Sequence, residues 1–475
     1  MQDLVKTVNI LIDTDASFIP KAEYVFRTFC RILGLNARFY YGKTFEEIQI
    51  YYGSNFNKKY PLHIFHNPKA VVFFDDKKLY PDDKIIKYRI QEEMIPFLFS
   101  PNGDLFISSQ NFLLIRKDII SSAFYFLSCW DEYVDNCEDG KRFEIEHSIQ
   151  FKNDFLDIPV VDRYCSIFSR GISIILPEYY KSFIWKKDNK FTLSISHDID
   201  YWEYWSDKFL KDTFDYNMKR FKKNPLNASY KLIFHFIDKK ILKQNTSKRN
   251  KKLLQKEKKM SVRPTCFFLA KEDFEDERQN YFSEKIKKFN KLNTTIGLHA
   301  SREAAYNLDI LQDEINAFKN YGIQVKGIRF HYLAFNYQKT FRNLEYLGIT
   351  FDSTLGFWEN IGFRAGISFP FYPYNLEENR PFRVLEIPLI VMDMTMFSKK
   401  SMNLSPNKAK KRLRKLIDKT QKSNGHISLL FHNTMFEPID YPGWSNVFWN
   451  TLKYAKRKKG WLCSPNQLFN YWKRK

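Results

Sequence analysis

The sequence lacks several features that would assign it to a familiar class. It has no uninterrupted apolar run of the ~18 residues that a membrane-spanning helix needs, so we expect no such helix. Residues 1–18 show neither a basic leader region nor a small-residue cleavage site, so we expect no signal peptide. The six cysteines are scattered and form no CxxC pair. This pattern excludes a disulfide framework or zinc knuckle and predicts reduced packing residues in a cytoplasmic protein.

Acidic residues are scarce relative to basic ones, and the formal net charge is +22. Residues 206–260 hold 17 Lys/Arg against 5 Asp/Glu and thus contribute much of that excess. Three interpretations stay open for this stretch: a solvated face that reflects background composition, a contact with anionic lipid headgroups or acidic glycans, or nucleic-acid binding. The absence of a known nucleic-acid-binding motif places the last interpretation behind the other two.

Length and hydrophobic pattern predict two units in the 475 residues. Residues 1–185 are predicted to form a smaller mixed α/β domain, and residues 186–475 a larger barrel. In the first unit, alternating apolar runs predict strands at 8–13, 47–52, 61–66 and 70–75, and helical spacing predicts helices at 24–35 and 118–134.

From residue 191 strands and helices alternate, with about seven strand–helix units. This alternation favours a distorted (β/α)7-type parallel barrel over an open sheet. The basic stretch 206–260 lies between the first two predicted strands and is interpreted as an inserted helical arm. Predicted strands are 191–196, 263–270, 294–300, 325–332, 349–354, 382–393 and 426–433, and predicted helices are 283–292, 308–321, 338–347, 408–422 and 445–456.

One predicted strand ends in a dense group of ionisable side chains. In FTLSISHDID, residues 191–200, six alternating residues predict a half-buried strand that ends at His197, Asp198 and Asp200. Alternation places the two carboxylates on one side if the extended path continues. Such a pair beside a histidine can hold a divalent cation and leave one carboxylate as a base. The alternative is a loop of solvated acids that caps the next helix.

Ionisable or polar residues also end five other predicted strands of this unit. Functional side chains of parallel barrels come from the carboxyl ends of the strands. The residues found there are His299, Arg329, His331, Tyr332, Asp352, Glu386, Asp393, His432 and Asn433. Because six strands of one barrel end in this way, we interpret the pattern as a sign of an enzyme. For His197 we favour a hydrogen bond behind the site, and Asp352 and Asp393 are as well placed to brace loops as to touch a substrate.

In their order and spacing these motifs resemble those of the polysaccharide deacetylase superfamily (carbohydrate esterase family four), over residues 190–475. The N-terminal half resembles an uncharacterised domain often placed before such barrels in bacterial chains, which implies no activity. The matching motifs are SHDID for TFDDG, His299 with Ser301 for H-[ST]-x-x-H, Arg329–Tyr332 for RxPY, LEIPL around Glu386 for the fourth motif, and LLFH ending at His432 for L-x-H.

The resemblance implies a catalytic role for four residues. Asp198 would be the general base that takes a proton from water, and Arg329 would orient it and keep it ionised. The backbone N–H of Tyr332 would help to stabilise the oxyanion. His432 would be the general acid that protonates the leaving group.

The resemblance also implies a divalent metal, and the sequence departs from the family where the ligands are expected. Asp200 and His299 are the first two expected ligands. The second histidine of the family motif is Glu303 here, Ser301 lies one place late, and the proline of RxPY is His331. We therefore expect His331, or else Glu303, to supply the third ligand. A His/Asp set favours zinc or a similar first-row ion.

Three functions follow from these observations. The first is a metal-dependent hydrolase that removes acetyl groups from an acetylated glycan, either a cytoplasmic sugar intermediate or a lipid-linked surface-polysaccharide precursor at the inner membrane surface. The second is a glycan-binding or assembly protein that keeps the barrel without the reaction. The third is a charge-driven partner of anionic membranes or nucleic acid, although we expect no nucleic-acid partner.

Overall fold

The computed structural model describes residues 6–42, 47–81, 84–90, 92–135, 142–177, 185, 189–200, 246–269, 289 and 294–474. Residues 206–245 of the predicted insertion lie outside the described residues, as does all of the predicted helix at 283–292 except residue 289. No helix in the described ranges is long and apolar enough to cross a bilayer.

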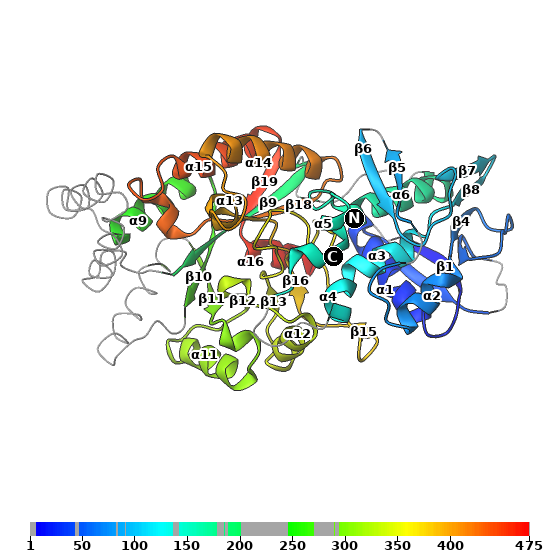
Figure 1. Cartoon of the computed structure of the whole chain (residues 1–475), viewed down its shortest axis with the longest axis horizontal. Helices are drawn as coiled ribbons and strands as arrows, with labels where there is room; N and C mark the ends of the chain where they lie inside the picture. Colours follow the sequence, from blue (N-terminus) through cyan, green and yellow to red (C-terminus); the bar gives the residue numbers. More distant parts are fainter. Residues whose placement is uncertain are drawn as a thin grey trace.

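The N-terminal unit is built on a six-stranded sheet of order β2-β1-β3-β4-β8-β7 (Figure 1). The strands are parallel except for β7, which runs antiparallel to β8. The strands of this unit are β1 Thr7–Asp13, β2 Asn36–Tyr40, β3 Ile50–Gly53, β4 Leu62–Phe65, β7 Phe106–Ser109 and β8 Phe112–Ile115, with the separate hairpin β5 Ile86–Ile90 and β6 Glu93–Phe97. Its helices are α1 Ile19–Leu33, α2 Pro68–Asp75, α3 Ile119–Leu127, α4 Trp130–Asp135, η1 Ile145–His147, α5 Ile149–Lys152 and α6 Val160–Ile175.

Two local predictions in this unit were wrong. Residues 70–75 were expected to be a strand but belong to helix α2, because Pro68 occupies its first turn and the side chain of Asn67 caps it by accepting from the Lys69 N–H. The expected single helix 118–134 is two helices, α3 and α4. Cys129 lies between them with φ of 45°, a left-handed conformation that an α-helix cannot continue through.

The second unit is a curled parallel sheet of order β16-β13-β12-β11-β10-β9-β18-β17, in which β19 also pairs with β9. It forms a distorted half-barrel, which confirms the predicted α/β barrel preceded by a smaller α/β domain. Figure 1 shows α14 and α15 on one side of the sheet and α11 and α12 on the other. The strands are β9 Phe191–Ile199, β10 Thr265–Leu269, β11 Thr295–Ala300, β12 Gly327–Phe330, β13 Phe351–Asp352, β16 Leu385–Glu386, β17 Val391–Met392, β18 His426–Leu430 and β19 Gly460–Cys463, with the two-stranded pair β14 Tyr374–Asn375 and β15 Arg380–Pro381. The helices are α9 Thr246–Lys259, η5 Glu303–Ala305, α11 Leu308–Asn320, η6 His331–Leu333, α12 Tyr337–Tyr346, α13 Asp393–Phe397, α14 Pro406–Gln421, η7 Asn433–Phe436, α15 Trp444–Arg457 and α16 Pro465–Trp472.

The sheet is curled because its two edges come from one short segment. Residues 382–393 were expected to be one strand, but they form β16 at one edge and β17 at the other. The chain between them, residues 387–390, crosses the gap and donates two hydrogen bonds on the way, from Ile387 N to the carbonyl of Asp352 in β13 and from Leu389 N to the carbonyl of Leu355 in the loop after β13. The barrel is therefore completed by loops rather than by a continuous ladder.

Strand β9 lies in the middle of this sheet, and all nine of its residues are buried. The sequence predicted a half-buried strand because Thr192, Ser194 and Ser196 alternate with apolar residues. Two of these hydroxyls instead have buried partners: Ser194 Oγ lies 2.7 Å from His426 Nε2, and Ser196 Oγ accepts from Arg329 Nη1 at 2.8 Å. Hydrogen bonds of this kind allow polar residues to be buried on both faces of a strand.

Helix α9 is the described end of the predicted basic insertion, and it packs on the barrel. Leu253 and Leu254 are buried, and the carboxylate of Glu257 lies 3.0 Å from His197 Nε2. Most of its lysines occupy the other positions of the helix. The described part of the insertion is thus anchored to the outer side of β9.

A chain of hydrogen bonds links the two units through buried groups. Asp162, in α6, accepts from the backbone N–H of Ser368 at 2.9 Å and from its hydroxyl. The Ser368 carbonyl lies 3.1 Å from His426 Nδ1, and His426 Nε2 in turn meets Ser194 of β9. Since a carbonyl only accepts, Nδ1 carries a proton and donates it to this bond.

This arrangement predicts a pH dependence of stability. Burial lowers the pKa of His426 to about 3, whereas an unfolded histidine titrates near ~6.5. Below pH ~6.5 the unfolded chain therefore binds a proton that the folded chain does not, and stability is lost as the pH falls toward the folded pKa. Between pH 7 and pH 5 we expect His426 to account for a loss of about 2 kcal/mol in the free energy of unfolding.

The measurement is urea unfolding of the wild type and of His426→Gln at both pH values. Glutamine can keep a donor and an acceptor at this position without titrating, so the variant should lose less stability on acidification. An equal loss in both proteins would contradict the assignment.

Candidate metal centre and catalytic site

Side chains from four strand ends meet at the carboxyl end of β9. Asp200 lies in the middle of this group. Its Oδ1 is 3.4 Å from His299 Nε2, and its Oδ2 is 3.7 Å from His432 Nε2 and 4.0 Å from His331 Nε2. The parallel register brings these strand ends together. His299 of β11 is paired with Leu269 of β10 on one side and with Arg329 of β12 on the other, so the three strands end at the same level.

Asp200, His299 and His331 form a group that could hold a metal ion. Each offers one ligand atom, and these atoms lie within 4.8 Å of one another. Two buried atoms of the group, Asp200 Oδ1 and His299 Nε2, have no hydrogen-bond partner among the residues that the structure describes. Unpaired buried polar atoms are costly, and a cation between them would satisfy both. The donor set of two imidazoles and one carboxylate fits a first-row divalent ion.

Neighbouring groups prepare these side chains for that role. His299 Nδ1 lies 2.9 Å from the carbonyl oxygen of Arg329, which fixes the tautomer and leaves the lone pair on Nε2. Burial, reinforced by His299, lowers the pKa of His331 to about 4, so its imidazole is neutral at pH 7. Burial would raise the pKa of Asp200, but the imidazoles of His432 and His299 outweigh it and hold that pKa below the usual range.

Asp198 is held in place by the guanidinium of Arg329. Arg329 Nη1 donates to Asp198 Oδ1 at 2.9 Å, and both side chains are buried. The other Asp198 oxygen, Oδ2, lies 3.7 Å from His299 Nε2 and faces the metal group. Thus Oδ1 of Asp198 is bound by the Arg329 guanidinium, and Oδ2 is directed toward the metal group.

His432 has a carboxylate behind it and the site in front. Asp393 Oδ1 lies 2.7 Å from His432 Nδ1, and Asp393 Oδ2 accepts from the backbone N–H of His432 at 2.6 Å. Burial disfavours the imidazolium, but Asp393 and Asp200 favour it more strongly and raise the pKa of His432 to about 10. His432 therefore carries a proton that it can deliver from Nε2.

Two predicted residues lie at the edge of this group. Tyr332 has φ of 59° and Leu333 of 52°, and this left-handed turn costs roughly 1–2 kcal/mol per non-glycine residue. Tyr332 is 56% exposed, and its ring stacks on that of His331 with centroids 4.0 Å apart. Glu303 is exposed on η5 and lies outside the three-residue group.

One contributing residue, Glu257, was not identified from the sequence. His197, as expected, points away from the site, where its Nδ1 meets the Phe431 carbonyl at 2.7 Å. The other partner of His197 is Glu257 of α9. In the sequence, the only sign of this contact is a single glutamate among the lysines of a basic helix. Asp352 and Glu386 form a buried acid pair, and burial raises the pKa of both carboxyls. Asp352 raises the pKa of Glu386 further, whereas the hydrogen bond with Glu386 opposes the rise for Asp352.

The chain was compared with family models, with curated proteins and with solved structures. Residues 10–177 match the model of a family of unknown function (DUF7033). A search of curated proteins gives no match. Similar solved structures include Puue allantoinase, at 12% identity and a TM-score of 0.42 over 62% of this chain and 95% of that chain. They also include a probable polysaccharide deacetylase from Pseudomonas aeruginosa PAO1, at 14% identity and a TM-score of 0.42 over 61% and 93%. The chemistry of the site has to be inferred from its side chains.

The third metal ligand can be tested by metal content. We expect Asp200→Ala and His331→Ala to lose stoichiometric zinc after dialysis, because each removes one of three ligands. Glu303→Ala is the matched control and should retain it. The metal is measured by plasma mass spectrometry, with circular dichroism to check folding. Full zinc in His331→Ala together with loss in Glu303→Ala would reverse the assignment.

Proposed function

We propose that the chain is a metal-dependent deacetylase that removes an acetyl group from an acetylated sugar. The supporting observation is the convergence of an Arg-held carboxylate, a three-residue metal group and an Asp-backed histidine around Asp200. Hydrolysis of an acetamide needs a base for water, a stabiliser for negative charge and an acid for the amine, and this site offers a candidate for each.

Zinc, or a similar divalent ion bound by Asp200, His299 and His331, would act as a Lewis acid and make water more acidic. Asp198 would take the proton from the attacking water, with Arg329 fixing the carboxylate in place. The water oxygen forms a bond to the acetyl carbon, and negative charge develops on the carbonyl oxygen, where the Tyr332 N–H would donate. The C–N bond then breaks as His432 gives its proton to the leaving amine, and acetate and the free amino sugar result.

The same groups would hydrolyse an O-acetyl ester, with an alcohol as the leaving group. We propose an acetylated sugar of a surface polysaccharide, or its lipid-linked precursor, as the substrate. The predicted contact of the basic stretch with an anionic membrane depends mainly on residues 206–245, which lie outside the described part of the chain.

Acetate release tests this function. With chitooligosaccharides and other acetylated amino sugars as substrates, we expect a chelator to abolish release and zinc to restore it. Asp198→Asn should lower kcat by roughly 10²–10⁴-fold, the contribution of a general base, while its zinc content stays unchanged. Asp313→Asn, an exposed acid on α11, is the control and should behave as wild type.

Two outcomes would contradict the proposal. One is no acetate release from any acetylated sugar by the zinc-loaded protein. The other is full activity in Asp198→Asn. Sugar binding without turnover would favour the alternative of a glycan-binding protein on the same barrel.

A further inference from the structure

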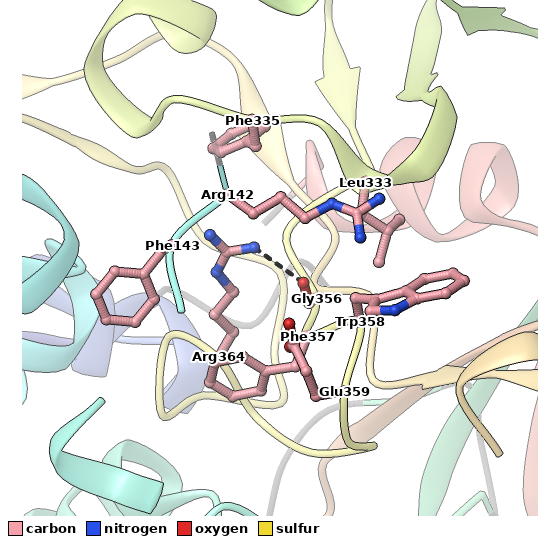
Figure 2. Close-up of a pocket in the computed structure, with 9 residues that line it drawn as sticks. All are labelled: Arg142, Phe143, Leu333, Phe335, Gly356, Phe357, Trp358, Glu359 and Arg364. Carbon is pink, nitrogen blue, oxygen red and sulfur yellow. Dashed lines mark hydrogen bonds between the residues drawn. The ribbon is translucent and has the colours of Figure 1, made fainter. Parts of the chain in front are cut away.

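A hollow lies between the two units, next to the turn that carries Tyr332. Its walls come from residues 142–143 of the N-terminal unit, residues 333–335 after β12 and residues 356–364 of the loop after β13. Its enclosed volume is about 10 Å³, room for about one water molecule, and the rest of the hollow is open to solvent. Figure 2 shows Arg142 reaching across it toward Leu333, with Trp358 below. Both units therefore contribute to a cavity beside the proposed catalytic site.

The two arginines of this hollow differ in how they are neutralised. Arg364 forms a double ion pair with Glu132, from Nε and Nη2 at 2.6 Å each, and both side chains are 7% exposed. Its Nη1 donates to the Gly356 carbonyl at 2.9 Å (Figure 2). The charge of Arg364 is therefore neutralised by the carboxylate of Glu132.

Arg142 has no such carboxylate. Within the described ranges, its guanidinium makes one hydrogen bond, from Nη2 to the Tyr332 carbonyl, and no ion pair. It lies over the ring of Trp358, 5.0 Å from the centroid. Burial lowers the pKa of Arg142, and Arg302 and Arg364 lower it further against the opposing charge of Glu359. Glu359, which also lines the hollow, acts on Arg142 without forming an ion pair with it among the described residues, and an anion at this position could pair with the guanidinium directly.

The position relative to the catalytic residues connects this hollow to the reaction. Tyr332 and Leu333 directly follow the ligand His331, and Arg142 holds the carbonyl of that same turn. Trp358 also packs against Leu333, Leu389, Met392 and Leu430 on the barrel side. A sugar bound at the metal group would therefore have its neighbouring substituent close to Arg142 and the Trp358 ring.

We propose that this hollow binds an anionic group, a phosphate or a carboxylate, carried by the acetylated sugar, with Arg142 as its main contact. The inference rests on the proposed function and specifies the substrate as an anionic acetylated sugar. Guanidinium groups bind both anions through paired, charge-assisted hydrogen bonds. The Trp358 ring supplies an apolar face against which the sugar can pack. The N-terminal unit thereby determines which sugar is accepted.

The test compares three probes with the zinc-loaded protein: methyl N-acetylglucosaminide, N-acetylglucosamine 1-phosphate and N-acetylmuramic acid. The first is neutral, and the others carry a phosphate and a carboxylate. We expect at least one anionic probe to have a KM roughly tenfold or more below that of the neutral probe, which also identifies the anion. Arg142→Ala should raise that KM by roughly 10–100-fold, the effect of losing a charged hydrogen bond. Its kcat and the KM of the neutral probe should stay within about threefold.

Two variants serve as controls. Arg142→Lys should recover part of the affinity, because it keeps the charge without the planar fork. Arg342→Ala removes an arginine whose side chain is 47% exposed on α12, and it should change nothing. Equal KM values for neutral and anionic probes in wild type and Arg142→Ala would overturn the inference while leaving the deacetylase intact. An equal fall in kcat on all probes would also overturn it, because Arg142 would then only hold the Tyr332 turn.

A binding measurement separates failure of this inference from failure of the proposed function. If no probe is deacetylated, calorimetry with N-acetylglucosamine 1-phosphate and N-acetylmuramic acid on wild type and Arg142→Ala still decides. If either probe binds more tightly to wild type than to Arg142→Ala, the anion site is supported. If each probe binds equally well to the two proteins, the inference is overturned.

Discussion

The buried guanidinium of Arg329 is the constraint on which the candidate site depends. It is fully buried and donates to Ser196 and Asp198 of β9 and to the carbonyl and hydroxyl of Ser353 after β13, at 2.8–3.0 Å. A buried cation is costly unless its donors are satisfied, so the strands that supply these acceptors are fixed relative to one another. The same bonds aim Asp198 at the metal group, so the stability of the barrel and the proposed catalysis depend on one network.

Because successive side chains of a strand point to opposite faces of the sheet, neighbouring residues of these strands have different partners. Asp198 faces Arg329 and the metal group, whereas His197, one position earlier, faces Glu257 of α9 on the other side. The proposed base is thus held from inside the barrel, and the end of the basic insertion is held from outside. In the same way Ser353 faces Arg329, while Asp352 lies beside Glu386 in a buried acid pair.

The sequence was sufficient for features that follow from period and topology. Parallel strands bring their carboxyl ends to one edge, so His299, Arg329 and His432 could be expected to meet Asp198 and Asp200. Features set by local turns were not predictable. The choice between His331 and Glu303 depends on a left-handed turn at non-glycine residues, and the apolar run 70–75 has the composition of a strand but begins with a helix cap. Contacts between units, such as Arg142 with Tyr332, have no sequence signature at all.

The central claim is that two imidazoles and one carboxylate bind a single ion at the carboxyl end of β9. X-ray absorption at the zinc edge of the loaded protein tests it most directly. We expect nitrogen and oxygen ligands at about 2.0–2.2 Å, with the outer-shell scattering of two imidazole rings, and one imidazole fewer in His331→Ala. A sulfur shell near ~2.3 Å, or a spectrum without imidazole scattering, would contradict it.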